Sequence, residues 1–191
     1  IINNLDLKIQ GPSASGTNDS VHHGVLYYYL IAPLYAIFKG NPIMVSFSLG
    51  LLSLLTIWPI TWLTCRFTKS KIMALAAATL YALSVESSQT GTWLSNPMIS
   101  IISVPFFFFF LWRVFWDKKF NELPWLALAL GISHQSAIYS IFLFGSLIAT
   151  SFYFWGKNNL SVLTNKKVVL VSLFVYLTTV STMILNQVLL M

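Results

Sequence analysis

The chain has 191 residues, of which 57% are hydrophobic and only 8% are charged, and its mean hydropathy is +0.75. These values lie far outside the range of soluble globular domains, so the composition excludes a soluble enzyme or soluble binding module and indicates an integral membrane protein. The formal charge of +6 does not indicate nucleic-acid binding, because the lysines and arginines form short clusters between apolar runs rather than one continuous basic face.

The first 41 residues are expected to form an extracytoplasmic loop that ends in a helix on the membrane surface. Residues 1–20 are polar and rich in Gly, Ser, Asn and Pro, which is typical of a loop. Residues 25–38 are apolar and aromatic but short for a membrane span, and Pro33 interrupts them. An interfacial helix is therefore favoured there, and the KGNP sequence of residues 39–42 ends it.

Residues 42–191 are expected to form a bundle of transmembrane helices. A span needs roughly 20 apolar residues, which leaves room for about six spans in the chain. Residues 123–155 are too long for one ordinary span, and we interpret them as two short helices that turn near His134. The apolar stretches on which the other spans are predicted are 43–65, 72–85, 98–116 and 168–191. Because the chain begins with Ile1 rather than methionine and ends within an apolar stretch, we expect it to be a fragment of a longer protein.

The basic residues predict how the bundle is oriented. Cytoplasmic loops of membrane proteins carry an excess of Lys and Arg. The opposite, extracytoplasmic side would then hold only Lys8 and Lys39 among the cations, together with all three histidines of the chain. Nine of the eleven Lys and Arg fall on alternate loops, which we predict to be cytoplasmic: Arg66, Lys69, Lys71, Arg113, Lys118, Lys119, Lys157, Lys166 and Lys167.

The sequence VHHGVLYYYL of residues 21–30 is the most conspicuous polar and aromatic segment before the predicted spans. His22 and His23 could bind a metal, transfer a proton or donate hydrogen bonds to a phosphate. Adjacent side chains rarely point the same way, which favours the phosphate role over a metal site. The following tyrosines, of which Tyr27 and Tyr28 are the first two, could anchor the helix at the interface or contact a sugar or lipid.

Two later segments carry further polar candidates on the same predicted side. Residues 86–97 are predicted to form a loop without Lys or Arg, and Asn96 near its end could cap the next helix or contact a ligand. His134 and Gln135 lie at the predicted helix break. Polar groups at such depth are costly and usually face a cavity, so both a site role and a satisfied structural role stay open.

The order of five short segments resembles the integral-membrane glycosyltransferases of the GT-C superfamily. The segments are GPSAS, HHGVLYYYLIAP, a basic turn, WLSNP and GISHQSA, and the resemblance runs from about Ile2 to His134. It is closest to the bacterial branch related to the dolichyl-phosphate-mannose protein mannosyltransferases (glycosyltransferase family 39). The resemblance implies an all-α, GT-C-like bundle that transfers a sugar from a polyprenyl-phosphate donor to a glycan, lipid or protein acceptor on the outer face of the cell membrane.

The same resemblance implies roles for individual residues. His22 and His23 would contact the donor phosphate, and the catalytic base would be an acidic residue upstream of Ile1. No metal ligand set is implied, although a divalent metal stays possible. Contacts to the sugar or acceptor would come from Tyr27, Tyr28, Asn96, His134 and Gln135.

Two other classes of function compete with an enzyme. A transporter or lipid flippase would also suit a polar cluster among short, broken helices, but it predicts paired intramembrane charges or an inverted repeat, and the sequence shows neither. In a non-catalytic membrane scaffold the polar outer cluster would be incidental. Transfer of sugar from a polyprenyl-phosphate donor distinguishes the first class from both others.

Overall fold

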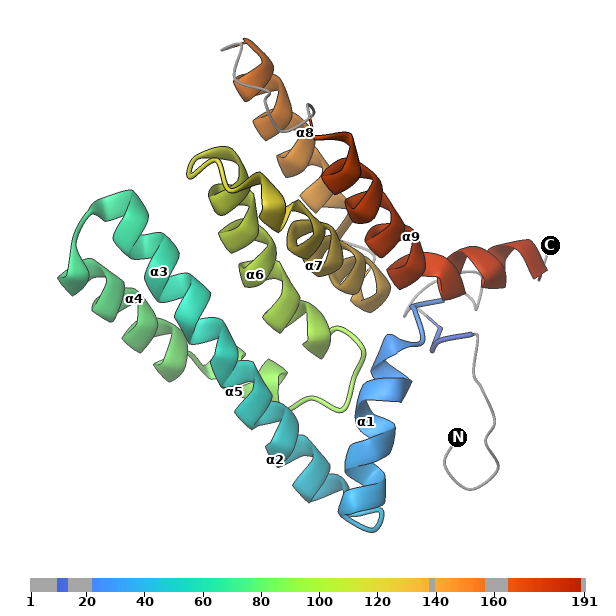
Figure 1. The fold of residues 1–191 in the computed structure, drawn as a ribbon. Helices are drawn as coiled ribbons and strands as arrows, with labels where there is room; N and C mark the ends of the chain where they lie inside the picture. The colour runs from blue at the N-terminus through green and yellow to red at the C-terminus, as the bar shows by residue number, and fades with distance from the viewer. Residues whose placement is uncertain (1–9, 14–21, 138–139, 157–164, 190–191) are drawn as a thin grey trace.

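A computed structural model describes residues 10–13, 22–137, 140–156 and 165–189 (Figure 1). Within these ranges the regular structure is helical, apart from an isolated β-bridge between Ser13 and His22, which confirms the all-α class. Two 3₁₀ turns, Leu54–Thr56 and Phe120–Glu122, separate some of the helices. The α-helices are α1 (Leu26–Ile37), α2 (Pro42–Ser53), α3 (Ile57–Thr68), α4 (Lys71–Leu83), α5 (Val85–Gly91), α6 (Met98–Phe115), α7 (Leu123–Ser136), α8 (Ile141–Gly156) and α9 (Lys166–Leu189).

Three of the described helices are long and apolar enough to cross a membrane: Pro42–Thr68, Met98–Phe115 and Lys166–Leu185. The first is α2 and α3 joined by the 3₁₀ turn. Pro59 explains this turn, because a proline ring clashes with the carbonyl four residues earlier, here that of Leu55. These three candidate membrane spans indicate a membrane protein. The count of about six spans stays a prediction, because α1, α4 and α8 are apolar but shorter.

The predicted loop at residues 86–97 is wrong in part, because its first half forms α5. Ser84 accounts for this helix: its backbone is extended and its hydroxyl accepts a hydrogen bond from the backbone N–H of Ser87 at 3.0 Å, as an N-cap does. The predicted division of residues 123–155 into two helices is confirmed, since α7 ends at Ser136 and α8 begins at Ile141.

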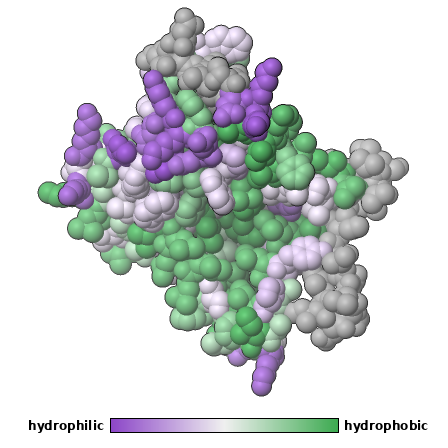
Figure 2. Space-filling model, viewed as in Figure 1, coloured by the Kyte–Doolittle hydropathy of each residue, from purple (hydrophilic) through white to green (hydrophobic). Residues whose placement is uncertain are grey.

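The turns that carry the basic residues meet at one end of the bundle. In Figure 1 the α3–α4 and α6–α7 turns lie at the same end as the close of α8 and the start of α9. Hydrophilic residues gather there, and the sides of the molecule are mostly hydrophobic (Figure 2). Arg66 at the end of α3 lies 3.5 Å from Asp117, so this ion pair links the α3–α4 turn to the α6–α7 turn. Arg113 forms a bidentate ion pair with Glu122 across the α6–α7 turn. Lys8 and Lys157 lie outside the described residues.

Helix α7 is the centre of the packing, between α6 on one side and α9 on the other. Phe107 and Val114 of α6 are fully buried against Leu126 and Ala129 of α7. On the α9 side, a Cβ atom on Gly131 would lie 2.9 Å from the Cβ of Thr179, so glycine allows the close approach of the two helices. This packing fixes the C-terminal end of α7, where the predicted site residues lie.

A second core cluster holds α1 on the bundle. Tyr27 of α1 packs with Leu49 of α2 and with Met98 and Ile99 of α6. The helix predicted to lie at the membrane surface corresponds to α1, and buried apolar contacts attach it to the predicted spans. The division of the chain into an outer loop (1–41) and a bundle (42–191) stays a prediction.

Candidate functional site

The side chain of Gln135 joins three helices at the C-terminal end of α7. Its Oε1 accepts a hydrogen bond from the backbone N–H of Leu26, at the start of α1, at 3.2 Å. Its Nε2 donates to the carbonyl of Thr179 and, at 3.2 Å, to the hydroxyl of Thr182 on α9. Only 4% of this residue is exposed. A buried amide that is bonded in this way orients the groups around it, because each lost partner would leave a desolvated polar atom.

The carbonyls at the end of α7 are bound by groups that come from other segments. The Gln135 carbonyl accepts from the backbone N–H of Gly24 at 2.7 Å and from Nδ2 of Asn96 at 3.1 Å. The same Asn96 nitrogen lies 3.2 Å from the Ser136 carbonyl. The last carbonyls of a helix have no intrahelical partner, so Asn96 caps the C-terminus of α7. The sequence predicted that Asn96 could cap the following helix. This is wrong for α6, whose N-cap residue is Pro97.

The GPSAS segment, which begins at Gly11, and the HHGVLYYYLIAP segment, which contains Gly24, meet beside this cap. The backbone N–H of His23 donates to the carbonyl of Pro12 at 2.9 Å. A Cβ on Gly11 would lie 2.1 Å from the carbonyl oxygen of His23, and a Cβ on Gly24 would lie 2.1 Å from Oε1 of Gln135. Only glycine fits at such distances, so both glycines are required by close approach of the chain to itself.

The two histidines have different surroundings. The His22 ring lies 3.2 Å from the Gly11 carbonyl through Nδ1 and 2.7 Å from the amide nitrogen of Gln10 through Nε2. With its proton on Nδ1, the ring donates to the Gly11 carbonyl and accepts from the Gln10 amide at Nε2. His23 is half-buried, and its ring has no hydrogen-bond partner recorded among the described residues. His23 is therefore the histidine with donor capacity left for a ligand.

Burial lowers the pKa of His23 below its usual 6.5, and the charge of His22 lowers it further. The ring is accordingly neutral at physiological pH and offers one N–H rather than a positive charge. Within the part of the chain that the structure describes, no three His, Cys, Asp or Glu side chains come together as metal ligands.

The lowered pKa predicts how stability depends on pH. As the pH falls through 6.5, the unfolded chain takes up a proton at His23 before the folded chain does, so the folded state loses stability from there down to the lower folded pKa. We expect the melting temperature of the purified protein to fall when the pH is lowered from about 7 to about 5, and to fall less in His23→Gln. Equal falls in both proteins would contradict the assignment.

The other predicted residues diverge. Tyr27 is 5% exposed and its ring lies in the core, although its hydroxyl has no partner among the described residues; Tyr28 is half-buried beside it. The ring of His134 packs edge-on against Phe144 of α8, with 5.7 Å between ring centroids, so it leaves Gln135 to face α1 and α9. The structure thus brings Asn96 and Gln135 together with His22 and His23, which we call the histidine segment, and it places His134 toward α8.

Several buried polar atoms around the α7–α8 break lack a partner within the described ranges. They are Oδ1 of Asn96, Nδ1 of His134 and the hydroxyl oxygens of Ser136 and Ser140. Buried polar atoms in native proteins are nearly always bonded to protein or to ordered water. Each of these atoms therefore needs a partner, which an ordered water or a hydroxyl of a ligand would supply.

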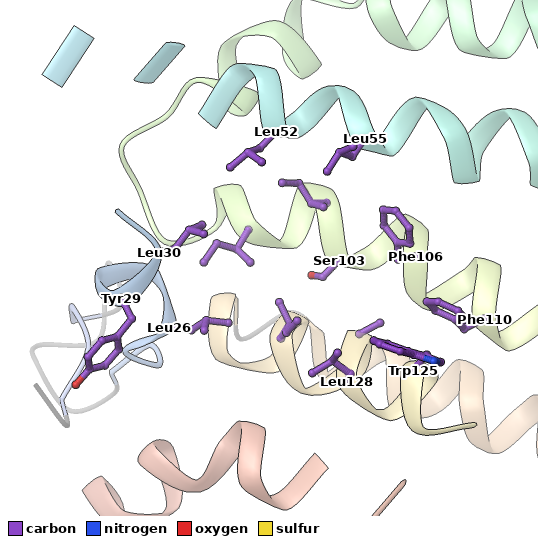
Figure 3. Close-up of a pocket in the computed structure, with 14 residues that line it drawn as sticks. Leu26, Tyr29, Leu30, Leu52, Leu55, Ser103, Phe106, Phe110, Trp125 and Leu128 are labelled. Atoms are coloured by element: carbon purple, nitrogen blue, oxygen red, sulfur yellow. The ribbon is translucent and has the colours of Figure 1, made fainter. Parts of the chain in front are cut away.

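An apolar groove of about 680 Å³ runs between α1, α2, α6 and α7 (Figure 3). Leu26, Tyr29 and Leu30 lie at one end of it, and Phe110 and Trp125 lie at the other. From Ile99 to Phe110 the groove follows α6 for about 16 Å at 1.5 Å per residue. Ser103 contributes a hydroxyl to the lining, and this hydroxyl accepts a hydrogen bond from Ser133 at 2.7 Å. The volume lies within the roughly 300–1,000 Å³ typical of ligand sites.

The groove begins where the histidine segment ends. Leu26 lines the groove and also donates its backbone N–H to Gln135, and it follows His23 by three residues. Tyr29, which lines the groove, is the third of the tyrosines predicted to anchor the helix or to contact a sugar or lipid. The sequence did not predict Gly24, Thr179 and Thr182 as partners of Gln135. Glycine inside a predicted motif is a signal of close approach that could have identified Gly24.

Comparison of the chain with protein-family models, with curated proteins and with solved structures finds no match.

Proposed function

We propose that the chain is part of a multi-pass membrane glycosyltransferase, mannosyltransferase-like and of the GT-C type, that transfers a sugar from a polyprenyl-phosphate donor to a glycan, lipid or protein acceptor. The observation that carries this proposal is the apolar groove that begins at the histidine segment. A long apolar chain next to a polar headgroup is the shape of a lipid-linked donor. The groove would hold the apolar chain of the donor, and the segment around His23 would hold its polar headgroup.

The groove supports binding of the lipid part of the donor. Its 14 lining residues are apolar except for the hydroxyls of Tyr29 and Ser103 and the indole N–H of Trp125, so a hydrocarbon chain would not strand any charge there. Its length of about 16 Å along α6 suits an extended chain rather than a compact small molecule.

The histidine segment supports binding of the donor phosphate. A neutral His23 ring can donate one hydrogen bond to a phosphate oxygen. The negative charge of the phosphate would raise the pKa of the ring and so favour its doubly protonated form. When the bond between the anomeric carbon and the phosphate oxygen breaks, charge develops on the departing lipid phosphate, and such a donor stabilises it. The acceptor hydroxyl loses its proton to the carboxylate that the resemblance places upstream of Ile1.

The unpartnered polar atoms support binding of sugar or acceptor hydroxyls. Oδ1 of Asn96 and the hydroxyls of Ser136 and Ser140 are buried and lie at the α7 end that holds the histidine segment. With the basic end of the bundle in the cytoplasm, this site faces outward at the plasma membrane, and the shorter helices α4, α7 and α8 complete about six spans.

The test is sugar transfer by the purified protein, in the longest form that its reading frame encodes, from a polyprenyl-phosphate sugar. We expect His23→Ala to lower turnover at least about tenfold, because one charge-stabilising donor is lost. Gln89→Ala, on the exposed surface of α5, is the matched control and should retain turnover. Wild-type turnover in His23→Ala would remove His23 from the site. Lipid translocation without sugar transfer would favour a flippase instead.

A further inference from the structure

A second cavity, of about 310 Å³, lies between α3 and α4 at the basic end of the bundle. Two tryptophans of α3 form one wall and the first turns of α4 form the other. The residues that line it include Trp58, Trp62, Cys65, Lys71, Ala74 and Leu75. The cavity is separate from the groove described above, with which it shares no lining residue.

The charges around this cavity favour an anion. Lys71 lines the cavity and is the first residue of α4, whose first turn carries no acidic side chain. The N-terminus of a helix carries partial positive charge, which adds to that of the ammonium group. Lys69 precedes it, and the guanidinium of Arg66 lies over the Trp62 ring at 4.9 Å. Asp117 offsets the charge of Arg66 at 3.5 Å, which leaves the two lysines in excess.

The apolar wall selects the kind of anion. Trp58 is 53% exposed and Leu75 is 68% exposed, so this apolar wall is open to the surroundings of the molecule. Tryptophan and lysine together at the end of a membrane helix are typical of the level of lipid headgroups. A soluble anion would use the lysine and leave this wall empty, whereas a phospholipid would use both.

We propose that this cavity binds one anionic phospholipid, with its headgroup phosphate at Lys71 and an acyl chain against Trp58 and Leu75. The proposal depends on the location of the chain in a membrane and not on glycosyltransferase activity. It assigns a structural lipid to the α3–α4 hairpin.

Cys65 allows a direct test, because it is the single cysteine of the chain and it lines the cavity. The rate at which a maleimide modifies Cys65 is measured in the purified full chain in detergent, with added phosphatidylglycerol or phosphatidylcholine. Phosphatidylglycerol should slow the reaction about fivefold more than phosphatidylcholine does, as expected for one lysine near an anionic headgroup. Inorganic phosphate should give no protection.

Variants separate the site from general charge attraction. Lys71→Gln should lose the extra protection by phosphatidylglycerol, and Lys71→Arg should retain it. Lys166→Gln removes the same charge from an exposed position at the start of α9, and it should behave as wild type. Equal protection by both lipids, protection by phosphate alone, or equal loss in Lys71→Gln and Lys166→Gln would each overturn the proposal.

Discussion

Replacing Gln135 by alanine is expected to lower the free energy of unfolding by about 2–4 kcal/mol, since each buried polar group left without a partner costs about 1–3 kcal/mol. The substitution strands the backbone N–H of Leu26 and removes both donors to α9. It also leaves a cavity where three helices meet. Denaturation of the purified protein in detergent, followed by circular dichroism, measures the change.

Two comparisons show whether the cost comes from the buried hydrogen bonds. Gln89→Ala makes the same chemical change on the exposed surface of α5, and we expect it to alter stability by less than about 0.5 kcal/mol. Thr182→Val removes one of the partners of Gln135 and should cost about 1 kcal/mol. If Gln135→Ala were as mild as Gln89→Ala, Gln135 would not organise the site.

The positions of the helices could be predicted because hydropathy and helix-start signals agree. Residues 43–65 form one apolar stretch, and Asn41 begins the helix by accepting hydrogen bonds from the N–H groups of Ile43 and Met44 at 3.0 and 3.4 Å. Ser70 similarly begins α4 by accepting from Met73 at 3.3 Å. The helix α5 was missed because its sequence, VESSQTG, is polar and has no apolar period, and because most of its residues (Val, Ser, Thr and Gly) are weaker helix formers than Ala or Leu.

The candidate site could be predicted only as separate residues. Asn96 and Gln135 were both selected as polar groups in apolar surroundings, yet the hydrogen bond between them spans 39 positions and depends on how α6 and α7 pack. Thr179 and Thr182 gave no signal at all, because threonine in an apolar helix commonly bonds to its own backbone, as Thr179 does to the Val175 carbonyl at 2.7 Å. Which threonine meets Gln135 is decided by tertiary packing.

The second large effect is expected at Gly24. An alanine there would place its Cβ 2.1 Å from Oε1 and 2.7 Å from the Cβ of Gln135. The Gln135 side chain cannot move aside without breaking its bonds to Thr179 and Thr182, so the histidine segment has to shift away from α7. We expect Gly24→Ala to destabilise the protein by about 1–3 kcal/mol, as overpacking does, and to lower sugar transfer at least as much as His23→Ala.

Gly145→Ala is the matched control for Gly24→Ala. Nothing lies within 4 Å of a Cβ built on Gly145 in α8, and alanine is preferred over glycine in helices by up to about 1 kcal/mol. The same substitution should therefore stabilise at one glycine and destabilise at the other. Because Gly24→Ala and Gln135→Ala disrupt one shared contact, their costs in the double variant should sum to less than the two single costs, since coupled sites are not additive. Full additivity would mean that Gly24 and Gln135 act independently, and the proposed anchoring of the histidine segment by Gln135 would fail.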